Sequence, residues 1–507
     1  MTLRELIEGL DEPPVAIRGD LDVDVRSLAY DSRAVVPGTL FFALPGTRTH
    51  GERFVAAAAA AGAVAVVVPA AVDVAAGITV IEIPRIHRAM SEIAARFHGR
   101  PSRRLSLVGV TGTNGKTTTT YVLESIWRAA GRVPGVIGTI NYRIGDREWP
   151  AALTTPQPVD LQGLLAQMVG GGATDVAMEV SSHALALDRV RDCDFDGAVF
   201  TNLTRDHLDF HADMESYFEA KARLFTDVLP SSTKPEPFAV IHRDDPFGAR
   251  LVERVRTRVV TFGRGDDADV APVGVESSIS GLRGGIRVGR ERLDIDSPLV
   301  GDAHLQNLLA ATATAVAQSI GPEAIREGIA RCRSVPGRME RVDGGAPFAV
   351  LVDYAHTPDA LERALLALRE LTSGRLVVVF GCGGDRDRGK RPIMGEAAAR
   401  ISDLVVLTSD NPRTEEPAEI LRAIEQGVRQ GGLEPIDEAS ARDSERGYVV
   451  LADRTRAIRL AIDLARPGDV VLIAGKGHEP YQILGTEKRP FDDRVEARRS
   501  LEEVLPA

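Results

Sequence analysis

The chain has 507 residues, of which 44% are hydrophobic and 26% charged, and its formal net charge is −11. This length exceeds what one hydrophobic core supports and predicts about two to four domains of ordinary globular composition. The acidic balance argues against a general nucleic-acid binder, because no basic surplus exists to replace counterions along phosphates.

Targeting and membrane signals are the next features that the sequence excludes. The three cysteines are scattered and odd in number, which suits a reducing cytosol and gives no zinc pattern. The N-terminus has acidic residues among its apolar positions and no signal-peptide core. The uncharged run 54–72 is nearly long enough to span a bilayer, but Gly62 and Pro69 split it into helix, turn and strand. We therefore expect a cytoplasmic protein with no membrane partner.

Residues 1–103 are predicted to form a smaller α/β domain at the N-terminus. Short apolar strands are expected around Ser27–Ala29, Thr39–Ala43 and Val64–Val68, and a helix over Ile86–His98. The polar loops between the strands, taken alone, are typical of ordinary turns rather than of a site.

Residues 104–334 alternate strand and helix, which predicts a largely parallel sheet covered on both faces. The expected strands are Leu105–Val110, Asp175–Val180, Gly197–Thr201, Phe238–His242 and Val259–Phe262. Residues 267–298 switch to short alternating segments with glycines, which suggests a hairpin insertion before a helix over Gln306–Gln318.

A glycine-rich turn follows the first of these strands, with glycines at 109, 112 and 115 before Lys116 and Thr117. Glycines let backbone N–H groups crowd around phosphate oxygens, and the N-terminus of the following helix adds partial positive charge. Lys116 would reach the β- and γ-phosphates and the Thr117 hydroxyl a Mg²⁺ ion. The standard motif has glycine where this chain has Val110, so a chance glycine turn stays the alternative.

Hard oxygen ligands and histidines follow the next two strands of this domain. The candidate metal ligands are Thr117, Glu179, Asp206, His207, Asp209 and His211. Glu179 ends an apolar run, so that its carboxylate needs a partner; helix capping or a salt bridge is the alternative. For His207 alone, a core histidine is the alternative.

Lys221 falls on a predicted helix with Tyr217 one turn before it and Leu224 and Phe225 one turn after. Such a lysine partly faces an apolar surface, and from these residues alone the favoured interpretation is an aliphatic stem that snorkels to solvent.

Residues 335–507 alternate again, with four apolar strands that each precede a polar, glycine-containing loop. The expected strands are Phe348–Asp353, Leu376–Phe380, Leu404–Thr408 and Val470–Ala474. Their loops combine arginines with carboxylates, namely Arg386, Arg388, Arg391, Arg413, Asp385, Asp410 and Glu479. Arginine suits a carboxylate and an acid suits an ammonium, so the mixture predicts a pocket for a zwitterion. Solvated loop charge is the alternative.

Six motifs in this order resemble the Mur ligases over essentially the whole chain. They are Gly-Thr-Asn-Gly-Lys-Thr-Thr (112–118), Glu-Val-Ser-Ser-His (179–183), Asn-Leu-Thr-Arg-Asp-His-Leu-Asp (202–209), Asp-Tyr-Ala-His-Thr-Pro-Asp (353–359), Asp-Asn-Pro-Arg (410–413) and Gly-Lys-Gly-His-Glu (475–479). The chain is most similar to the members that add the third peptide residue. The resemblance implies three α/β domains: an N-terminal uridine-nucleotide domain (1–103), a central P-loop ATPase (104–334) and a C-terminal Rossmann-like domain (335–507).

The function implied by the resemblance is ATP-dependent addition of meso-diaminopimelate to a UDP-muramoyl dipeptide through an acyl phosphate. It implies a cytoplasmic monomer that uses Mg²⁺, binds only small molecules and carries a CO₂-derived carbamate on Lys221. Arg413 favours diaminopimelate over lysine, because its fork would hold the distal carboxylate that lysine lacks.

Site residues carry over by motif match. ATP would be bound by Gly112, Thr113, Asn114, Gly115, Lys116, Thr117, Thr118, Asn307, Arg338 and Asp353. The metal would be held by Thr117, Glu179, His207 and carbamylated Lys221, and Lys116, Lys221 and His207 would be catalytic. The UDP substrate would contact Tyr30, Ser32, Thr47, Thr154, Thr155, Ser181 and Arg189. Diaminopimelate would contact Arg386, Asp410, Asn411, Pro412, Arg413, Gly475 and Glu479.

Three other functions stay open at this point. A lysine-adding Mur ligase and a folylpolyglutamate synthase-like ligase share the acyl-phosphate chemistry. A nucleotide-dependent switch would bind the nucleotide without ligation, but it has no need of a zwitterion pocket.

Overall fold

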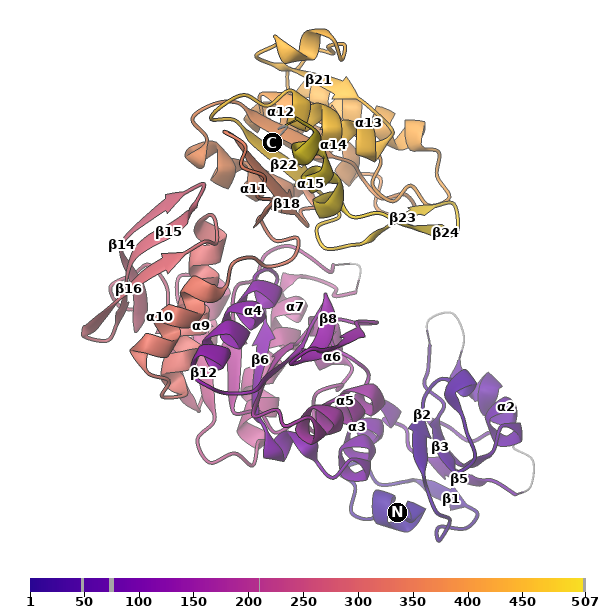
Figure 1. Ribbon diagram of the computed structural model, residues 1–507. Coiled ribbons are helices and arrows are strands. Elements are labelled where there is room, and N and C mark those ends of the chain that lie inside the picture. Colours follow the sequence, from indigo (N-terminus) through magenta and orange to yellow (C-terminus); the bar gives the residue numbers. More distant parts are fainter. Residues whose placement is uncertain (47–49, 73–76, 209, 505–507) are drawn as a thin grey trace. The chain divides into compact units, whose positions relative to one another are not determined.

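The computed structural model describes residues 1–46, 50–72, 77–208 and 210–504, which divide into two compact units. The first unit comprises Met1–Pro272, Ile286–Leu293 and Gln306–Gly328, and the second Val273–Gly285, Asp294–Leu305 and Ile329–Ala507. The chain is α/β in both (Figure 1).

The N-terminal part of the first unit is built on a five-stranded sheet of order β1-β5-β4-β3-β2. Strands β2 to β5 are parallel, and β1 pairs with β5 in the antiparallel sense. Its elements are α1 (Leu3–Ile7), β1 (Ala16–Arg18), β2 (Ser27–Ala29), β3 (Thr39–Phe42), α2 (Val55–Ala60), β4 (Ala63–Val68), β5 (Thr79–Glu82) and α3 (Ile86–Phe97). The uncharged run therefore forms a helix, a turn at Gly62 and a strand, as predicted.

A second sheet has eleven strands in the order β16-β15-β14-β13-β12-β11-β6-β10-β7-β8-β9. Its centre is parallel from β7 to β13, with antiparallel strands β8 and β9 at one edge. The strands are β6 (Ser106–Thr111), β7 (Pro134–Ile137), β8 (Asn141–Ile144), β9 (Arg147–Pro150), β10 (Asp175–Glu179), β11 (Gly197–Phe200), β12 (Phe238–His242), β13 (Arg258–Phe262), β14 (Val270–Ser278), β15 (Gly281–Val288) and β16 (Glu291–Ser297). The helices are α4 (Lys116–Ala129), α5 (Pro158–Gly170), α6 (Ser182–Ala186), α7 (Met214–Arg223), α8 (Pro246–Val252), α9 (Asp302–Ala317) and α10 (Pro322–Arg331).

The C-terminal sheet has the order β17-β18-β22-β19-β20-β21 and is parallel except for β17. The strands are β17 (Glu340–Arg341), β18 (Ala349–Asp353), β19 (Leu376–Phe380), β20 (Leu404–Leu407), β21 (Gly447–Val450) and β22 (Val470–Ala474), with a separate hairpin β23 (Tyr481–Leu484) and β24 (Glu487–Pro490). The helices are α11 (Pro358–Leu371), α12 (Lys390–Ile401), α13 (Pro417–Gln430), α14 (Arg454–Asp463) and α15 (Asp493–Val504).

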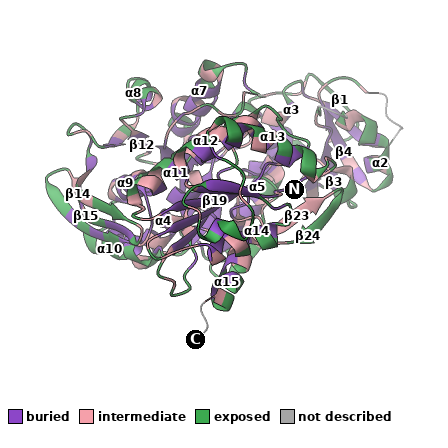
Figure 2. Ribbon diagram, turned by 90° about the horizontal axis from the view of Figure 1, so that it is seen from above, coloured by how far each residue is buried: buried purple, intermediate pink, exposed green. Residues whose placement is uncertain are grey.

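Alternate residues of the C-terminal strands face two separate hydrophobic cores. On β19, Val378 packs in the core formed with α11, α12 and α13, whereas Val377 and Val379 pack in the core formed with α14 and α15. Because both faces are covered, all five residues of β19 are buried (Figure 2), which explains why the strand reads as a continuous apolar run.

The predicted parallel strands are confirmed, each to within one residue of the predicted ends, and the predicted hairpin insertion over 267–298 is a run of three neighbouring strands, β14 to β16. The domain boundaries near 103 and 334 stay predictions. Among the described residues, no helix is long and apolar enough to cross a membrane.

Candidate active site

The glycine-rich turn joins β6 to α4 and is shaped by close approaches of other side chains. Gly112 has φ 148°, and a Cβ there would lie 1.9 Å from Thr201 Oγ1. Gly115 caps α4 with φ 87°, and a Cβ there would lie 2.3 Å from Asn307 Oδ1. Gly109 instead lies within β6, where a Cβ would meet the Phe195 ring at 2.8 Å. Two of the three glycines thus belong to the turn, and the third is a packing requirement of the strand.

Lys116, the first residue of α4, turns its ammonium back over the turn. Its Nζ donates to Gly112 O at 2.9 Å and Thr113 O at 2.8 Å. Asn114 N donates to Asn202 Oδ1 at 3.0 Å, which ties the turn to the loop after β11. A helix N-terminus that follows a glycine-rich turn and carries a lysine is the arrangement that holds nucleotide phosphates.

Glu179 ends β10 beside the N-terminus of α4 and is 1% exposed. Its Oε1 accepts from Thr117 Oγ1 and Thr139 N, each at 2.9 Å, and its Oε2 accepts from Thr139 Oγ1 at 2.9 Å. Within the described part of the chain its partners are therefore hydroxyls and an amide, and the salt-bridge alternative is wrong. A buried carboxylate beside the Thr117 hydroxyl has the donor chemistry for a hard cation.

Lys221 lies on α7 and is 1% exposed, so the snorkelling interpretation is wrong. Its Nζ donates to Gly112 O at 2.9 Å and lies 4.7 Å from the centre of the Tyr217 ring. Burial lowers the pKa of Lys221 well below its ordinary value, and the neighbouring charge of Lys116 lowers it further. The lysine on α7 is thereby held at the nucleotide turn, where its charged form is less favoured than that of a surface lysine.

His207 lies in an aromatic group beside this lysine. Its ring meets those of His183 at 5.1 Å and Tyr217 at 5.9 Å, and the Tyr217 hydroxyl lies 3.2 Å from Thr113 Oγ1. Its side chain is 42% exposed and its φ is 54°, which sets aside the core-histidine alternative. His211 is buried and its Nε2 lies 2.9 Å from Ser182 Oγ.

No group of three or more His, Cys, Asp or Glu side chains in the described residues could hold a metal ion. The candidate ligand set is thus incomplete without further oxygens, as is usual for Mg²⁺ bound together with phosphates and water. Asp209 lies outside the described residues.

The residues predicted to contact the sugar-peptide substrate converge on the end of β10. Thr155 Oγ1 donates to Glu179 O at 2.8 Å and accepts from Ser181 N at 3.0 Å. Arg189 donates to Thr155 O at 3.0 Å, and Thr154 Oγ1 lies 3.1 Å from Thr139 Oγ1. They therefore adjoin the candidate cation site.

The predicted uridine contacts lie in the N-terminal sheet domain. The Tyr30 hydroxyl donates to the Asp160 carboxylate on α5. Burial is the main cause that raises the pKa of Tyr30, and this hydrogen bond raises it further. Ser32 begins a 3₁₀ turn that follows β2. Thr47 lies outside the described residues.

The predicted adenosine contacts divide between the two units. Asn307 lies on α9 in the first unit, where its amide oxygen faces Gly115. Asp353 ends β18 in the second unit and accepts from Met339 N at 2.7 Å and Ala355 N at 2.9 Å. The Arg338 guanidinium lies 4.6 Å from the Tyr354 ring centre, in the same unit.

The loops after β20 and β22 bring the predicted amino-acid pocket together within the second unit. Asp410 and Asn411 are buried, Asn411 Nδ2 donates to Glu479 Oε2 at 3.0 Å, and a Cβ on Gly475 would lie 2.6 Å from Asp410 Oδ2. Arg413 Nη1 donates to Gly384 O at 2.8 Å. Pro412 is also buried, whereas Arg386 is exposed and bonds to the carbonyl of its neighbour Asp385.

Glu415 is a residue of this region that sequence reasoning missed. It accepts from both terminal nitrogens of Arg391, at 3.1 and 2.9 Å, and lies 3.1 Å from Arg388 Nη2. These two arginines are therefore paired within the loop. The signal lay in the Thr-Glu-Glu that follows the Asp-Asn-Pro-Arg motif.

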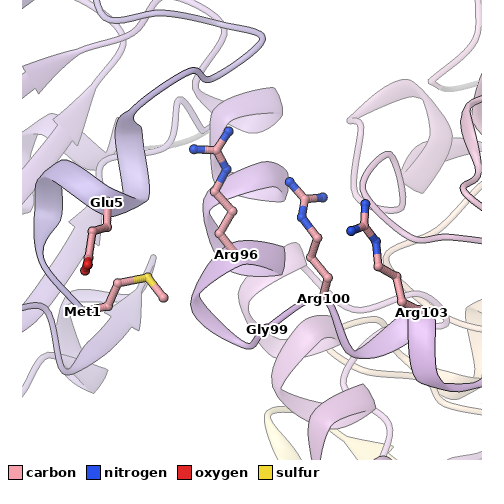
Figure 3. A pocket seen from close by; sticks show the side chains of 6 residues that line it. All are labelled: Met1, Glu5, Arg96, Gly99, Arg100 and Arg103. Carbon is pink, nitrogen blue, oxygen red and sulfur yellow. The ribbon is translucent and has the colours of Figure 1, made fainter.

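A separate pocket of about 470 Å³ lies near α1 and is lined by Met1, Glu5, Arg96, Gly99, Arg100 and Arg103 (Figure 3). Arg96 donates to the carbonyls of Leu6, Glu8 and Gly9. Arg103 pairs with Asp194 at 3.2 Å. Arg96 therefore satisfies carbonyls at the C-terminal end of α1, and Arg103 pairs with a carboxylate, so both arginines have structural partners within the protein.

Three protein-family profiles match the chain in succession. They are described as the Mur ligase family catalytic domain over residues 24–98, the Mur ligase middle domain over 110–315 and the Mur ligase glutamate ligase domain over 337–477.

Curated relatives match over nearly the full chain. The UDP-N-acetylmuramoyl-L-alanyl-D-glutamate–2,6-diaminopimelate ligase of Geobacter metallireducens is 49% identical over 494 residues, which cover 97% of both chains. The ligase of the same name from Streptomyces avermitilis is 46% identical over 496 residues, which cover 95% of this chain and 94% of that one.

Solved structures of ligases also resemble this chain. A structure of a ligase with that name superposes with a TM-score of 0.71 at 33% identity, covering 99% of each chain. Mycobacterium tuberculosis folylpolyglutamate synthase, complexed with ADP and AMPPCP, superposes with a TM-score of 0.62 at 20% identity, covering 82% of this chain and 96% of that one. The second likeness is one of fold alone.

Proposed function

The chain belongs to the Mur ligase family, and we propose that this ATP-dependent ligase adds meso-diaminopimelate to UDP-N-acetylmuramoyl-L-alanyl-D-glutamate. The observation that carries the proposal is the group of Lys116, Glu179 and Lys221 around one nucleotide turn. Full-length relatives named for this reaction support it. Because the family consists of ligases, the nucleotide-switch alternative is set aside.

The chemical problem is that a carboxylate is a poor acylating agent. Transfer of the γ-phosphate of ATP to the D-glutamyl γ-carboxylate gives an acyl phosphate, which the amine of diaminopimelate attacks with loss of phosphate. Both steps bring anions together, so catalysis rests on positioning and on positive charge at the nucleotide. Lys116 and the amides at the start of α4 supply that charge.

Mg²⁺ would be held by Thr117, Glu179, His207 and carbamylated Lys221. The fit rests on the Glu179 carboxylate, which is buried among hydroxyl and amide donors. When bound, the ion neutralises phosphate charge. A lowered Lys221 pKa favours the free amine that CO₂ must meet to form a carbamate.

The amine that attacks must be neutral, and His207, His356 or a carboxylate is proposed to accept its proton. His356 is exposed, and its Nδ1 lies 2.7 Å from Tyr354 O. A carbonyl oxygen only accepts, so Nδ1 carries the proton in this contact and Nε2 of a neutral ring can accept one. A monomeric, cytoplasmic enzyme stays part of the proposal.

The test is ADP release from purified protein with each substrate omitted in turn. We expect release to require the muramoyl dipeptide and diaminopimelate, and lysine to replace diaminopimelate poorly. Equal use of lysine would favour the lysine-adding alternative. Use of a folate substrate in place of the muramoyl dipeptide would favour the folylpolyglutamate synthase-like one.

A further inference from the structure

Lys476, in the loop after β22, is a completely buried cation without a part in the reaction proposed above. Its side chain is 0% exposed. Its Nζ donates to Asn411 Oδ1 at 3.1 Å and to Glu479 Oε2 at 3.4 Å, and lies 4.0 Å from Asp410 Oδ1. A cation this deeply buried requires partners, and here they are residues of the predicted amino-acid pocket.

Asn411, predicted to contact diaminopimelate, has its amide engaged inside the protein. Its Oδ1 accepts from Lys476 Nζ and also from Ile483 N at 2.9 Å, while its Nδ2 donates to Glu479 Oε2. An amide oxygen has two lone pairs, and both are used. Asn411 therefore orients Glu479 and is fixed by Lys476.

The β23–β24 hairpin holds the same loop from its other side. Gln482 Nε2 donates to Asp410 O at 2.7 Å. Arg413 N donates to Ile483 O at 3.1 Å, and Gly485 N donates to Arg413 O at 2.7 Å. Residues 410–413 are thus paired to the hairpin almost as to a neighbouring strand, which limits the positions that the Arg413 side chain can reach.

A buried ion pair lies behind the two loops. Arg454 and Asp493 are both 0% exposed and pair at 2.7 Å. Arg454 also donates to Ala474 O at 3.0 Å and Ser409 O at 3.3 Å, the residues that precede each loop. The formal charges of Arg454 and Asp493 cancel. The formal charges of Asp410, Glu479 and Lys476 sum to one negative charge, which matches one ammonium group of a ligand.

We propose that Lys476 is a positioning residue for the accepting amino acid, which fixes Asn411 and Glu479 while the β23–β24 hairpin fixes the Asp-Asn-Pro-Arg loop. The inference rests on the amino-acid pocket of the proposed function. Lys476 does not touch the amino acid; it sets the place and the net charge of the groups that do.

The substitution Lys476→Met keeps an unbranched side chain that is one atom shorter, and it removes the charge. The buried carboxylate of Asp410 and the partly buried carboxylate of Glu479 would then lose the cation that they share, and the Asn411 amide oxygen would lose one of its two donors. Loss of a hydrogen bond to a charged group predicts a KM for diaminopimelate about tenfold to a hundredfold higher. The KM for ATP should stay within twofold, because none of these contacts involves the nucleotide turn. Gln482→Ala removes one neutral hydrogen bond, for which about a twofold to tenfold rise in the same KM is expected.

The experiment measures ADP release while each of the three substrates is varied, for wild type, Lys476→Met, Gln482→Ala and the control Lys488→Met. Lys488 lies on the same hairpin, is exposed, and has its Nζ 3.5 Å from the centre of the Tyr481 ring. A KM rise confined to diaminopimelate in the first two variants, with Lys488→Met at the wild-type value, supports the inference. An unchanged KM for diaminopimelate in folded Lys476→Met, or an equal rise in all three KM values, overturns it.

The same measurements separate a loss of folding in Lys476→Met from a failure of the proposed function. If Lys476→Met melts well below wild type, the half-buried Gln482→Ala decides, and an unchanged KM there overturns the inference. If wild type uses another amino acid in place of diaminopimelate, the proposed function fails. The same variants are then measured with that amino acid, and a KM rise confined to it still supports the positioning role.

Discussion

Glu179→Gln is the sharpest test of the candidate cation site, because the structure predicts a loss of charge with almost no loss of contacts. A glutamine carbonyl oxygen in the Oε1 position keeps the bonds from Thr117 Oγ1 and Thr139 N. Its NH₂ group, in the Oε2 position, donates to the Thr139 hydroxyl, which is able to accept as well as donate. The variant therefore preserves the shape and the three hydrogen bonds of the site.

Two magnitudes follow from this geometry. The free energy of unfolding of the ligand-free protein should change by less than about 1 kcal/mol, since no buried polar group loses its partner. Activity should fall about a hundredfold to a thousandfold, the usual loss when one preorganised electrostatic group is removed from a reaction that develops charge. The Mg²⁺ concentration for half-maximal rate should rise, because the site loses its buried carboxylate.

The assay combines ADP release over a Mg²⁺ titration with thermal melting. Glu92→Gln is the matched control, because Glu92 is also buried but pairs with Arg96 in the N-terminal sheet domain. The control should lose stability and keep its rate, the reverse of Glu179→Gln. A Glu179→Gln enzyme with at least a third of the wild-type rate and an unchanged Mg²⁺ midpoint would refute the assignment of Glu179 to the cation site.

Four other predictions test separate parts of the molecule. Gly115→Ala should raise the KM for ATP more than tenfold, because a Cβ would lie 2.3 Å from an amide oxygen; Gly145→Ala, with φ 55° and open space around it, is the control, and equal effects would contradict the reasoning. Lys221→Ala should abolish ligation in the ADP-release assay, and a fully active variant would refute the carbamate. Arg413→Ala should lose about 2–5 kcal/mol of discrimination for diaminopimelate over lysine, measured as a ratio of kcat/KM values. Burial lowers the pKa of His304 to about 4; because the unfolded chain binds more protons between pH 6.5 and 4, stability should fall as pH falls through that window, and His304→Gln should remove about 3 kcal/mol of this loss in melting experiments.

The strands of the parallel sheets could be predicted because both of their faces are buried. Val377 and Val379 serve one core and Val378 the other, so the sequence shows a continuous apolar run bounded by polar loops. Strands β7, β8 and β9, at one edge of the large sheet, were not predicted from the sequence. Strand β9 is exposed or partly exposed along its whole length and leaves no apolar pattern, whereas β7 is buried but begins with Pro134-Gly135, a pair that is typical of a turn.

The candidate site was predictable where a motif is contiguous and not where a contact joins distant segments. The turn around Gly112 and Gly115 is readable from local sequence. The partners that make those glycines necessary, Thr201 and Asn307, lie about ninety and two hundred residues further along the chain. Nothing local to Lys476 indicated that its ammonium is shared by two loops 65 residues apart.

Lys221 shows how the same residue pattern supports opposite interpretations. An aliphatic stem with apolar neighbours one turn away describes a lysine that snorkels and equally a lysine that is buried. The choice depends on where the helix lies against the sheet, which local periodicity does not encode. In the fold the ammonium meets a carbonyl of the nucleotide turn, and its lowered pKa follows from that burial and from Lys116. Burial, together with the neighbouring charge of Lys116, is the physical reason why this lysine, unlike a surface one, would favour the free amine that the proposed carbamate requires.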